Sequence, residues 1–384
     1  MYFPHELIIQ ILLRLPVKSL VRFKCVCKLW LTLISDTHFA NSHFQITAAT
    51  HTHRIMFISN SYDIDRFIDF EASLDQDTAS VSLNLNFMSS ESYFYNIEIK
   101  GSCRGIIFLY CCSNIYLWNP STGAHKQIPL SPIESKLDAY CCYLYGFGYD
   151  QSRDDYLLVL MSYDTSLANI SSHLEFFSLR DNVWKEIEGT NLPYMNASDD
   201  PRTGSLFNGA IHWLAFREDL SVNLIVAFDL MERKLLEMSL PDDFDHEPTF
   251  CDLWVFGDFL SLWAMGDDIV EIWVMKEYRV HSSWTKTLVL VLPIDGIPTS
   301  YFSPLGCTKS GQIVGTNGDN GLVKYDDKGQ LLEHHSYCND RSGSQLIMYT
   351  ESLLSPPNFL SEPKKLTQTI RTKRRSTRRR RMSY

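Results

Sequence analysis

The pattern of hydrophobic positions changes near residue 45, from a helical spacing to short runs typical of strands. In the helical part, apolar residues that share one helix face are Leu7, Ile8, Ile11, Leu12 and Leu15. Pro4 suits a first helical turn, and Pro16 ends the helix because its ring disfavours helical geometry at the preceding residue. Two further short helices are predicted from the spacing of Val17, Leu20 and Val21, and of Cys27, Trp30, Leu31 and Ile34. Three helices in about thirty residues cannot cover so much apolar side chain, so the surplus must pack on another domain or a partner.

From about Thr47 to Ser355 the chain consists of short segments rich in aromatic and β-branched residues, separated by Gly, Asn, Asp and Pro. No long amphipathic helix interrupts them, which argues against alternating strands and helices. Aromatic residues recur in similar hairpin patterns, 45 to 59 residues apart, at Phe70, Trp118, Phe177, Phe228, Trp273 and Tyr325. A period near fifty with hairpins in each copy predicts kelch-like propeller blades. A β-sandwich or two stacked sheets is the alternative.

The N-terminal residues resemble an F-box. The matching runs are Pro4-x-Glu6-Leu7, Ile11-Leu12-x-Arg14-Leu15-Pro16-Val17-Lys18-Ser19-Leu20, Phe23-x-Cys25-Val26-Cys27-Lys28-x-Trp30, and Ser35-Asp36-x-x-Phe39. One departure is Phe3, where the family usually has Leu. The resemblance implies a binding module that docks on the small Skp-type adaptor of a cullin–RING (SCF-type) ubiquitin ligase. A helical cap on the C-terminal domain is the alternative, whereas a secretory signal peptide is disfavoured because Glu6 and Arg14 interrupt the apolar run.

The resemblance also indicates which side chains would contact the adaptor or directly support that contact. They are Pro4, Leu7, Ile11, Leu12, Leu15, Pro16, Leu20, Cys27 and Trp30. The sequence does not separate those that face the adaptor from those that hold the three helices together.

The β-rich segments resemble the F-box-associated domain of plant F-box proteins over nearly all of residues 95–355. The pieces that carry this resemblance include Gly101-Ser-Cys-x-Gly105, Leu117-Trp-Asn-Pro-Ser-Thr-Gly123, Tyr145-Gly-Phe-Gly-Tyr-Asp150, Gly209-Ala-Ile-His-Trp213, Glu271-Ile-Trp-Val-Met275 and Tyr349-Thr-Glu-Ser-Leu353. One departure is Arg104, where Asn or Asp would be commoner. The resemblance implies an interaction domain.

Composition fits a soluble globular protein with an ample core: 45% of the residues are hydrophobic and 21% are charged. No apolar run approaches the ~18 residues of a membrane span. The ten cysteines follow no secretory signal, so they are expected to be reduced and to act mostly as small core residues.

The net charge of −10 is unevenly distributed. Residues 364–384 hold ten Lys or Arg and no acidic residue; removing those ten from the 35 basic residues leaves 25 against 45 acidic ones, a net charge of −20. The tail is expected to be disordered, with a nuclear-import signal as the alternative. Any contact of the tail with nucleic acid would be nonspecific and salt-sensitive.

The sequence offers no convincing catalytic or metal site. His51 and His53 could point to one face of a strand, but no further ligand has a suitable spacing, and His334 and His335 are expected in a surface loop. His212 is expected to be a core or strand-edge histidine. Nucleotide-binding and hydrolase motifs are absent, and the short Gly146-Phe-Gly148 run is expected to lie in a turn.

These inferences predict a mainly β protein: a three-helix F-box at 1–44, a kelch-like β-propeller at 45–355 and a disordered basic tail at 356–384. The expected function is substrate recognition for an SCF-type ligase, without catalysis, cofactor or metal, in the cytoplasm and/or nucleus. The partners would be the Skp-type adaptor, through it cullin and RING subunits, and an unknown target protein. Candidate target loops are Asp164–Ser172, Asn196–Thr203 and Asp242–Pro248, the last acidic enough to suit a basic patch. A propeller enzyme or lectin with a helical cap is the rival.

Overall fold

The structure is a computed structural model. It describes residues 4–48, 53–59, 66–74, 87, 97–111, 114–132, 141–164, 172–187, 193–197, 202–266, 269–292, 302–317, 321–336, 344–356 and 359. The basic tail from Lys364 onward lies outside these residues.

Four helices precede the first strand: α1 (His5–Leu12), α2 (Val17–Phe23), α3 (Lys28–Ser35) and α4 (Thr37–Ala48). The first three were predicted, and Pro4 and Pro16 stand at the N-caps of α1 and α2. The fourth was not predicted, and it continues past residue 44. It begins after Asp36, whose Oδ1 accepts a hydrogen bond of 3.0 Å from the backbone N–H of Phe39. This side chain satisfies an N–H that has no partner within the helix.

The rest of the described chain forms six antiparallel sheets, one of which has a short parallel addition. The first sheet holds β3 (Ile97–Cys103), β4 (Ile106–Cys111), β5 (Asn114–Trp118) and β6 (His125–Ile128), and the second holds β7 (Cys141–Asp150), β8 (Asp155–Asp164), β9 (Ser172–Ser178) and β10 (Val183–Glu186), with β12 (Arg202–Thr203) parallel to β7. The third holds β11 (Tyr194–Asn196), β13 (Ser205–Phe207), β14 (Ala210–Arg217), β15 (Val222–Asp229) and β16 (Lys234–Ser239). The fourth holds β17 (Cys251–Phe256), β18 (Phe259–Met265), β19 (Ile269–Met275) and β20 (Trp284–Val291). The other two are β21 (Ser303–Cys307), β22 (Ile313–Thr316), β23 (Gly321–Tyr325) and β24 (Leu331–Ser336); and β2 (Arg66–Asp69), β1 (His53–Ser59) and β25 (Ser344–Thr350). Single 3₁₀ turns precede β17 and β20, at Pro248–Phe250 and His281–Ser283.

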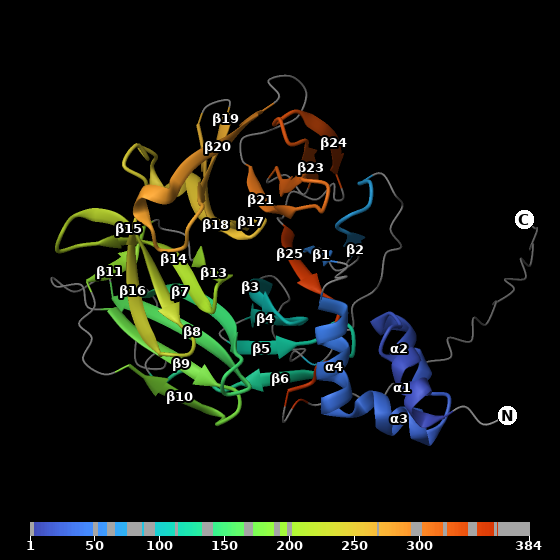
Figure 1. Ribbon diagram of the computed structural model, residues 1–384. Helices are drawn as coiled ribbons and strands as arrows, with labels where there is room; N and C mark the ends of the chain where they lie inside the picture. Colours follow the sequence, from blue (N-terminus) through green and yellow to red (C-terminus); the bar gives the residue numbers. More distant parts are fainter. Residues whose placement is uncertain are drawn as a thin grey trace, which may run out of the picture.

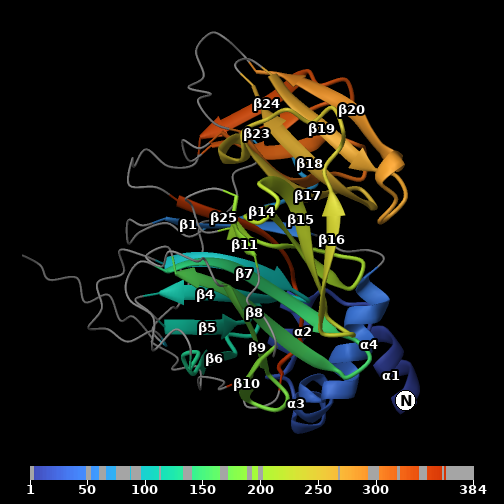
Figure 2. The ribbon, with the colours of Figure 1, turned by 90° about the vertical axis from the view of Figure 1, so that its left-hand side faces the viewer.

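The six sheets form a six-bladed β-propeller, which confirms the predicted architecture and argues against the sandwich. The sheets of β17–β20 and β21–β24 lie at the end of the molecule opposite the helices (Figures 1 and 2). Five of the predicted anchors lie in the third strands β5, β9, β15, β19 and β23, and Phe70 directly follows β2. All six anchors are buried. The sequence repeat therefore marks the same position in every blade.

The last blade joins the two ends of the propeller. Strand β1 pairs with β2 on one side and along its whole length with β25 on the other, from His53 opposite Thr350 to Ser59 opposite Ser344. Strand β25 also contacts the neighbouring blade, where Ser102 of β3 donates a hydrogen bond of 2.8 Å to the carbonyl of Met348. Strands from both ends of the described propeller thus close the ring.

Neighbouring blades pack through mixed hydrophobic clusters, and two glycines allow one close approach. Gly146 and Gly148 lie within β7, so the expectation of a turn was wrong. A Cβ added at Gly146 would lie 2.7 Å from Cζ2 of Trp213, and one at Gly148 would lie 2.6 Å from Cδ1 of Leu230. The glycines are therefore required by packing of the next blade and not by chain reversal.

Among the cysteines whose side chains the structure describes, none forms a disulfide. Cys103, Cys111 and Cys251 are buried, as expected for small core residues, whereas Cys25 and Cys27 are exposed.

Candidate functional site

The nine side chains predicted to serve adaptor binding divide into three groups by burial. Leu12 and Leu20 are fully buried in the core of the helices, while Leu15 and Trp30 are partly buried at its margin. The others are exposed: Pro4, Leu7, Ile11, Pro16 and Cys27. Leu7 and Ile11, one helical turn apart on α1, keep 51% and 54% of their surfaces exposed. These two side chains form an apolar strip on α1 that the described chain leaves about half exposed.

Three further apolar side chains are exposed on α3 or just before it: Val26 (60%), Leu29 (54%) and Leu31 (48%). The spacing grouped Leu31 with Ile34 on one face of the third helix and did not single out Leu29. In the structure, Cys27 is the extended N-cap of α3, and Ile34 is the buried residue of that helix. Leu29, Trp30 and Leu31 are consecutive apolar residues, so spacing alone did not identify the inner face of the helix.

The core of the helices is completed by residues from the far end of the chain. Leu353 and Leu354 are buried together with Leu12, Leu20 and Ile34. The helical periods of the sequence contain no sign of this contact, because it joins residues more than 300 positions apart. The helices are therefore built into the propeller and are not a freely tethered domain.

Helix α4 fixes the turn that precedes α2. Buried His43 lies with Nε2 2.8 Å from the carbonyl oxygen of Leu15. Burial lowers the pKa of His43, although the hydrogen bond to Leu15 opposes that shift. A neutral imidazole that donates from Nε2 satisfies the carbonyl of Leu15, in the turn between α1 and α2.

A second connection joins α4 to the propeller through Arg104, in the turn between β3 and β4. Its Nη2 donates a hydrogen bond of 2.9 Å to Oδ1 of Asn41. Its guanidinium carbon lies 5.0 Å from the ring centre of Phe44 and 3.8 Å from that of Tyr149. One arginine thus contacts the helices and two successive blades, and it is the residue at which the sequence departs from the usual pattern.

A third connection runs through Asn119, which follows β5. Its Nδ2 donates to the carbonyl oxygens of Ser352 and Leu354 at 3.1 and 2.8 Å. Its Oδ1 accepts from the backbone N–H groups of Ser121 and Thr122 at 2.8 and 3.3 Å. The same side chain therefore shapes the predicted Asn-Pro turn and holds the segment that carries Leu353 and Leu354.

Comparison with known families identifies both parts of the chain. The F-box domain matches residues 2–41, and the F-box associated beta propeller domain matches residues 54–328. The chain belongs to the F-box proteins with an F-box-associated β-propeller. Members of the F-box family are generally non-catalytic adaptors.

Similar proteins cover nearly the whole of this F-box protein. The F-box/kelch-repeat protein At3g23880 of Arabidopsis thaliana is 29% identical over 375 residues, which are 93% of this chain and 97% of that protein. F-box protein CPR1 of the same plant is 28% identical over 334 residues, covering 81% of this chain and 78% of that protein. Among solved structures, the Dos1 propeller is 12% identical with a TM-score of 0.37, covering 78% of this chain and 76% of that one, a likeness too distant to support any argument.

Of the three predicted target loops, the structure describes only Asp242–Pro248 throughout. Asp242, Asp243, Asp245 and Glu247 are exposed there, and Oδ1 of Asp242 lies 3.5 Å from Nε2 of His281. The loop itself is anchored by Phe244, whose ring contacts that of Trp273. The central residues of Asp164–Ser172 and Asn196–Thr203 lie outside the described residues.

Of the histidines that the sequence singled out, His51 lies outside the described residues, whereas His53, His212, His334 and His335 are described. His212 is buried, with Nδ1 3.1 Å from the carbonyl of Ser205 and Nε2 2.9 Å from the hydroxyl of Tyr278, as expected for a core histidine. Burial lowers its pKa to about 4. His334 and His335 lie in strand β24 and not in a loop.

Neither a metal centre nor a membrane-spanning helix is found in the part of the chain that the structure describes. The described residues contain no group of three or more His, Cys, Asp or Glu side chains arranged to hold a metal ion. No helix among them is long and apolar enough to cross a membrane.

Proposed function

We propose that this F-box protein is the substrate-recognition subunit of an SCF-type ubiquitin ligase. The F-box helices dock on the Skp-type adaptor, which links them to cullin and RING subunits. The propeller binds a target protein through loops between its strands. Ubiquitin transfer then depends on proximity, because the receptor raises the concentration of the target near a charged ubiquitin carrier.

The observation that carries this proposal is the apolar surface that the F-box helices leave uncovered. Their core already includes Leu353 and Leu354 of the C-terminal segment, yet Leu7 and Ile11 on α1, and Leu29 on α3, each remain more than half exposed. Large apolar side chains left exposed together on a small helical domain are a mark of interaction sites on soluble proteins. A partner that lays an apolar groove over these helices would cover them.

We divide the predicted contact set by burial into two proposed roles. We propose that the exposed or partly buried members contact the adaptor: Pro4, Leu7, Ile11, Leu15, Pro16, Cys27 and Trp30. Leu12 and Leu20 support the helices from inside. We add Val26, Leu29 and Leu31 as candidates for the same surface because of their exposure.

The test is co-purification of the full chain with a Skp-type adaptor, comparing the wild type with Ile11→Asp and Leu220→Asp. Ile11 is 54% exposed on α1, and Leu220 is 58% exposed on the propeller, so both aspartates remain hydrated in the free protein. Docking would bury the aspartate at position 11 in an apolar contact, at a cost of several kcal/mol, which corresponds to a loss of affinity of about a hundredfold or more. Leu220→Asp is the matched control and should bind as the wild type does.

The rival proposal is a propeller enzyme or lectin in which the helices serve as a cap. A cap would bury its apolar residues internally, whereas these residues are exposed. If the wild type remains soluble alone and does not bind the adaptor, or if Ile11→Asp binds as well as Leu220→Asp, the receptor proposal is wrong and the rival must be tested with sugar and substrate screens.

A further inference from the structure

The fourth sheet leaves three apolar side chains exposed at one corner. Ile269, at the start of β19, lies directly opposite Val291, at the end of β20. Val289 is two residues from Val291 and therefore lies on the same side of the strand. The exposed fractions of Ile269, Val289 and Val291 are 36%, 37% and 62%. Since cross-strand partners share a face of the sheet, the three side chains form one apolar strip, which we call the β19–β20 strip.

The acidic loop between β16 and β17 adjoins this strip. Glu271 lies directly opposite Val289 in the ladder, and its Oε2 lies 3.0 Å from Nε2 of His246 in the loop. His246 stands between Asp245 and Glu247, and both of these carboxylates are exposed. The loop therefore brings carboxylates to the margin of the β19–β20 strip.

The loop and the adjoining part of β19 carry a net negative charge. Their five carboxylates are those of Asp242, Asp243, Asp245, Glu247 and Glu271. Lys286 lies with Nζ 2.7 Å from Oε1 of Glu271, and with the histidines neutral, five negative charges and this one positive charge leave −4. Among the described residues, no lysine or arginine forms an ion pair with the four loop carboxylates. Arg202 donates to the carbonyl of Pro248, but its charge is paired with Asp252 at 2.9 Å.

A segment that covers this corner must present cations beside apolar side chains. The basic tail of the same chain has that composition. Residues 364–384 hold ten Lys or Arg and no acidic residue, and the apolar residues Leu366, Ile370 and Met382 stand among them. So few apolar residues cannot build a core of their own, so the tail gains buried apolar contacts only from another surface.

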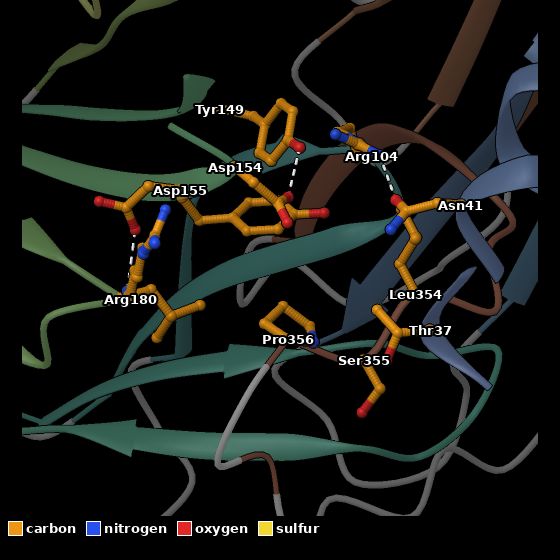
Figure 3. A pocket seen from close by; sticks show the side chains of 12 residues that line it. Thr37, Asn41, Arg104, Tyr149, Asp154, Asp155, Arg180, Leu354, Ser355 and Pro356 are labelled. Carbon is orange, nitrogen blue, oxygen red and sulfur yellow. Dashed lines mark hydrogen bonds between the residues drawn. The ribbon is translucent and has the colours of Figure 1, made fainter. Parts of the chain in front are cut away.

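The tail is long enough to reach this corner. Near the end of the described chain, Ser355 and Pro356 line a cavity together with Thr37 of α4 (Figure 3). Phe359 then packs on the core shared by the first two sheets. Residues 360–384 can extend to about 80 Å. A compact chain of this length has a radius of gyration of only about 21 Å, so any part of the surface is within reach.

The cavity beside Ser355 and Pro356 has no comparable excess of charge. Two guanidiniums and two carboxylates line it, from Arg104, Arg180, Asp154 and Asp155. Figure 3 shows the two arginines on opposite sides with Asp154 between them. Charge therefore favours the corner at the β19–β20 strip over this nearer cavity as the place where the tail binds.

We propose that residues 364–381 of the basic tail dock on the β19–β20 strip and the acidic loop of their own chain. Lysines and arginines of the tail pair with the loop carboxylates, while its apolar side chains cover the strip. The acidic loop is also a candidate target loop, so the docked tail competes with a target for it. That consequence rests on the proposed receptor function, whereas the docking itself does not.

The first test titrates a synthetic peptide of residues 364–384 into a full-length variant whose ten tail Lys and Arg are replaced by Gln, so that its own tail no longer competes. A flexible tether gives an effective concentration on the order of 1 mM, so docking requires a Kd of about 1 mM or tighter for the free peptide. Binding should also weaken as salt rises from about 0.05 to 0.5 M, because exposed ion pairs are screened. Absence of binding at up to about 5 mM peptide would overturn the proposal.

Charge variants of the same full-length protein locate the contact. Asp243→Asn, Asp245→Asn and Glu247→Gln together should weaken peptide binding about tenfold or more, since three ion pairs are lost. The matched control removes three exposed carboxylates elsewhere, with the substitutions Glu6→Gln, Glu186→Gln and Asp258→Asn. It should weaken binding far less. Equal losses in the two triple variants would mean that the tail responds only to overall charge, and the proposal would be wrong.

The apolar part is tested by Val291→Ser, with Val183→Ser as the control, since both valines are exposed at outer strands. Val291→Ser should weaken peptide binding severalfold, and Val183→Ser should leave it unchanged. In the wild-type chain, hydrogen exchange in residues 242–250 and 285–291 should be slower than in the tail variant, at every protein concentration. Equal exchange, or protection that grows with protein concentration, would overturn docking within one chain. Adaptor co-purification is unaffected by either result, so this proposal and the proposed function fail separately.

Discussion

Replacing Asn119 by alanine should disrupt the attachment of the F-box to the propeller. The side chain of Asn119 is fully buried and makes two kinds of hydrogen bond. Its amide nitrogen donates to the carbonyls of Ser352 and Leu354, and its amide oxygen accepts from the turn that follows β5. Alanine would remove both and leave two carbonyls in the junction without this donor.

Comparison with equivalent turns explains why asparagine is needed at this position. In the third blade, Asp229 accepts hydrogen bonds from the N–H groups of Met231 and Glu232 at 2.9 and 2.8 Å. Asp326 makes similar bonds to Lys328 and Gln330 in the fifth. A carboxylate is sufficient there because the turn requires only an acceptor. At position 119 the other half of the side chain must donate.

The magnitude follows from the two parts. Each carbonyl that loses its donor in a buried site costs about 1–3 kcal/mol, and each turn hydrogen bond contributes about 1 kcal/mol net. Asn119→Ala should therefore lower the free energy of unfolding by about 4 kcal/mol or more, whereas Asp229→Ala should lower it by about 1–2 kcal/mol because only turn bonds are lost. Asn119→Asp keeps the turn but places a carboxylate oxygen against two carbonyls, so it should be destabilised at least as much as the alanine variant.

The assay is urea unfolding followed by tryptophan fluorescence, with hydrogen exchange across residues 350–356. Midpoints convert to free energies provided that the urea dependence of the variants is the same. Exchange should rise in residues 350–356 of the two Asn119 variants and stay unchanged in Asp229→Ala. Wild-type stability in Asn119→Asp, or equal losses in Asn119→Ala and Asp229→Ala, would refute the reasoning.

Two further predictions concern the interior of the propeller. Gly146→Ala would place a Cβ against Trp213 and should cost about 1–3 kcal/mol, seen as a lower Tm, whereas Gly266→Ala, where the nearest atom would lie 3.6 Å away, should change Tm little. His212 has a pKa of about 4 in the folded protein because of burial, below the ordinary value of 6.5, so the unfolded chain binds its proton first as pH falls. Stability contributed by neutral His212 should be complete near pH 7.5, fall by about 2 kcal/mol at pH 5 and be lost further towards pH 4. His212→Gln should remove this part of the pH dependence in urea unfolding; an unchanged pH profile would contradict it.

The sequence predicted those features that depend on local period. Three helices, their bounding prolines and the six aromatic anchors follow from spacings that repeat within a few residues or from one blade to the next. Helix α4 was missed because Ala40 and His43 interrupt its apolar face, and polar residues such as Asn41 and Gln45 separate its few large apolar side chains. Its buried side contacts the rest of the F-box, where small and polar residues are enough to fill the space.

The junction could not be predicted because it depends on contacts between distant segments. The sequence predicted that Leu353 and Leu354 belong to the end of the β domain, yet they complete the core of the helices. Arg104 was noticed only as a departure from a pattern, and its positive φ and its contact with Asn41 became visible in three dimensions. A motif position occupied by an unexpected long side chain was the one signal available.

The closing of the propeller by β25 has a consequence for the order in which the protein can fold during synthesis. The F-box leaves the ribosome before the propeller, but Leu353 and Leu354, which complete its core, are among the last described residues to be made. Until then β1 also lacks β25 and presents an unpaired edge. A prematurely terminated chain would therefore expose an open sheet edge and an unfinished helical core together, and both are features that mark a polypeptide for chaperones and proteases. Leu353 and Leu354 lie just after β25, the strand that closes the ring. The core of the F-box can therefore be completed only after the entire propeller has been made.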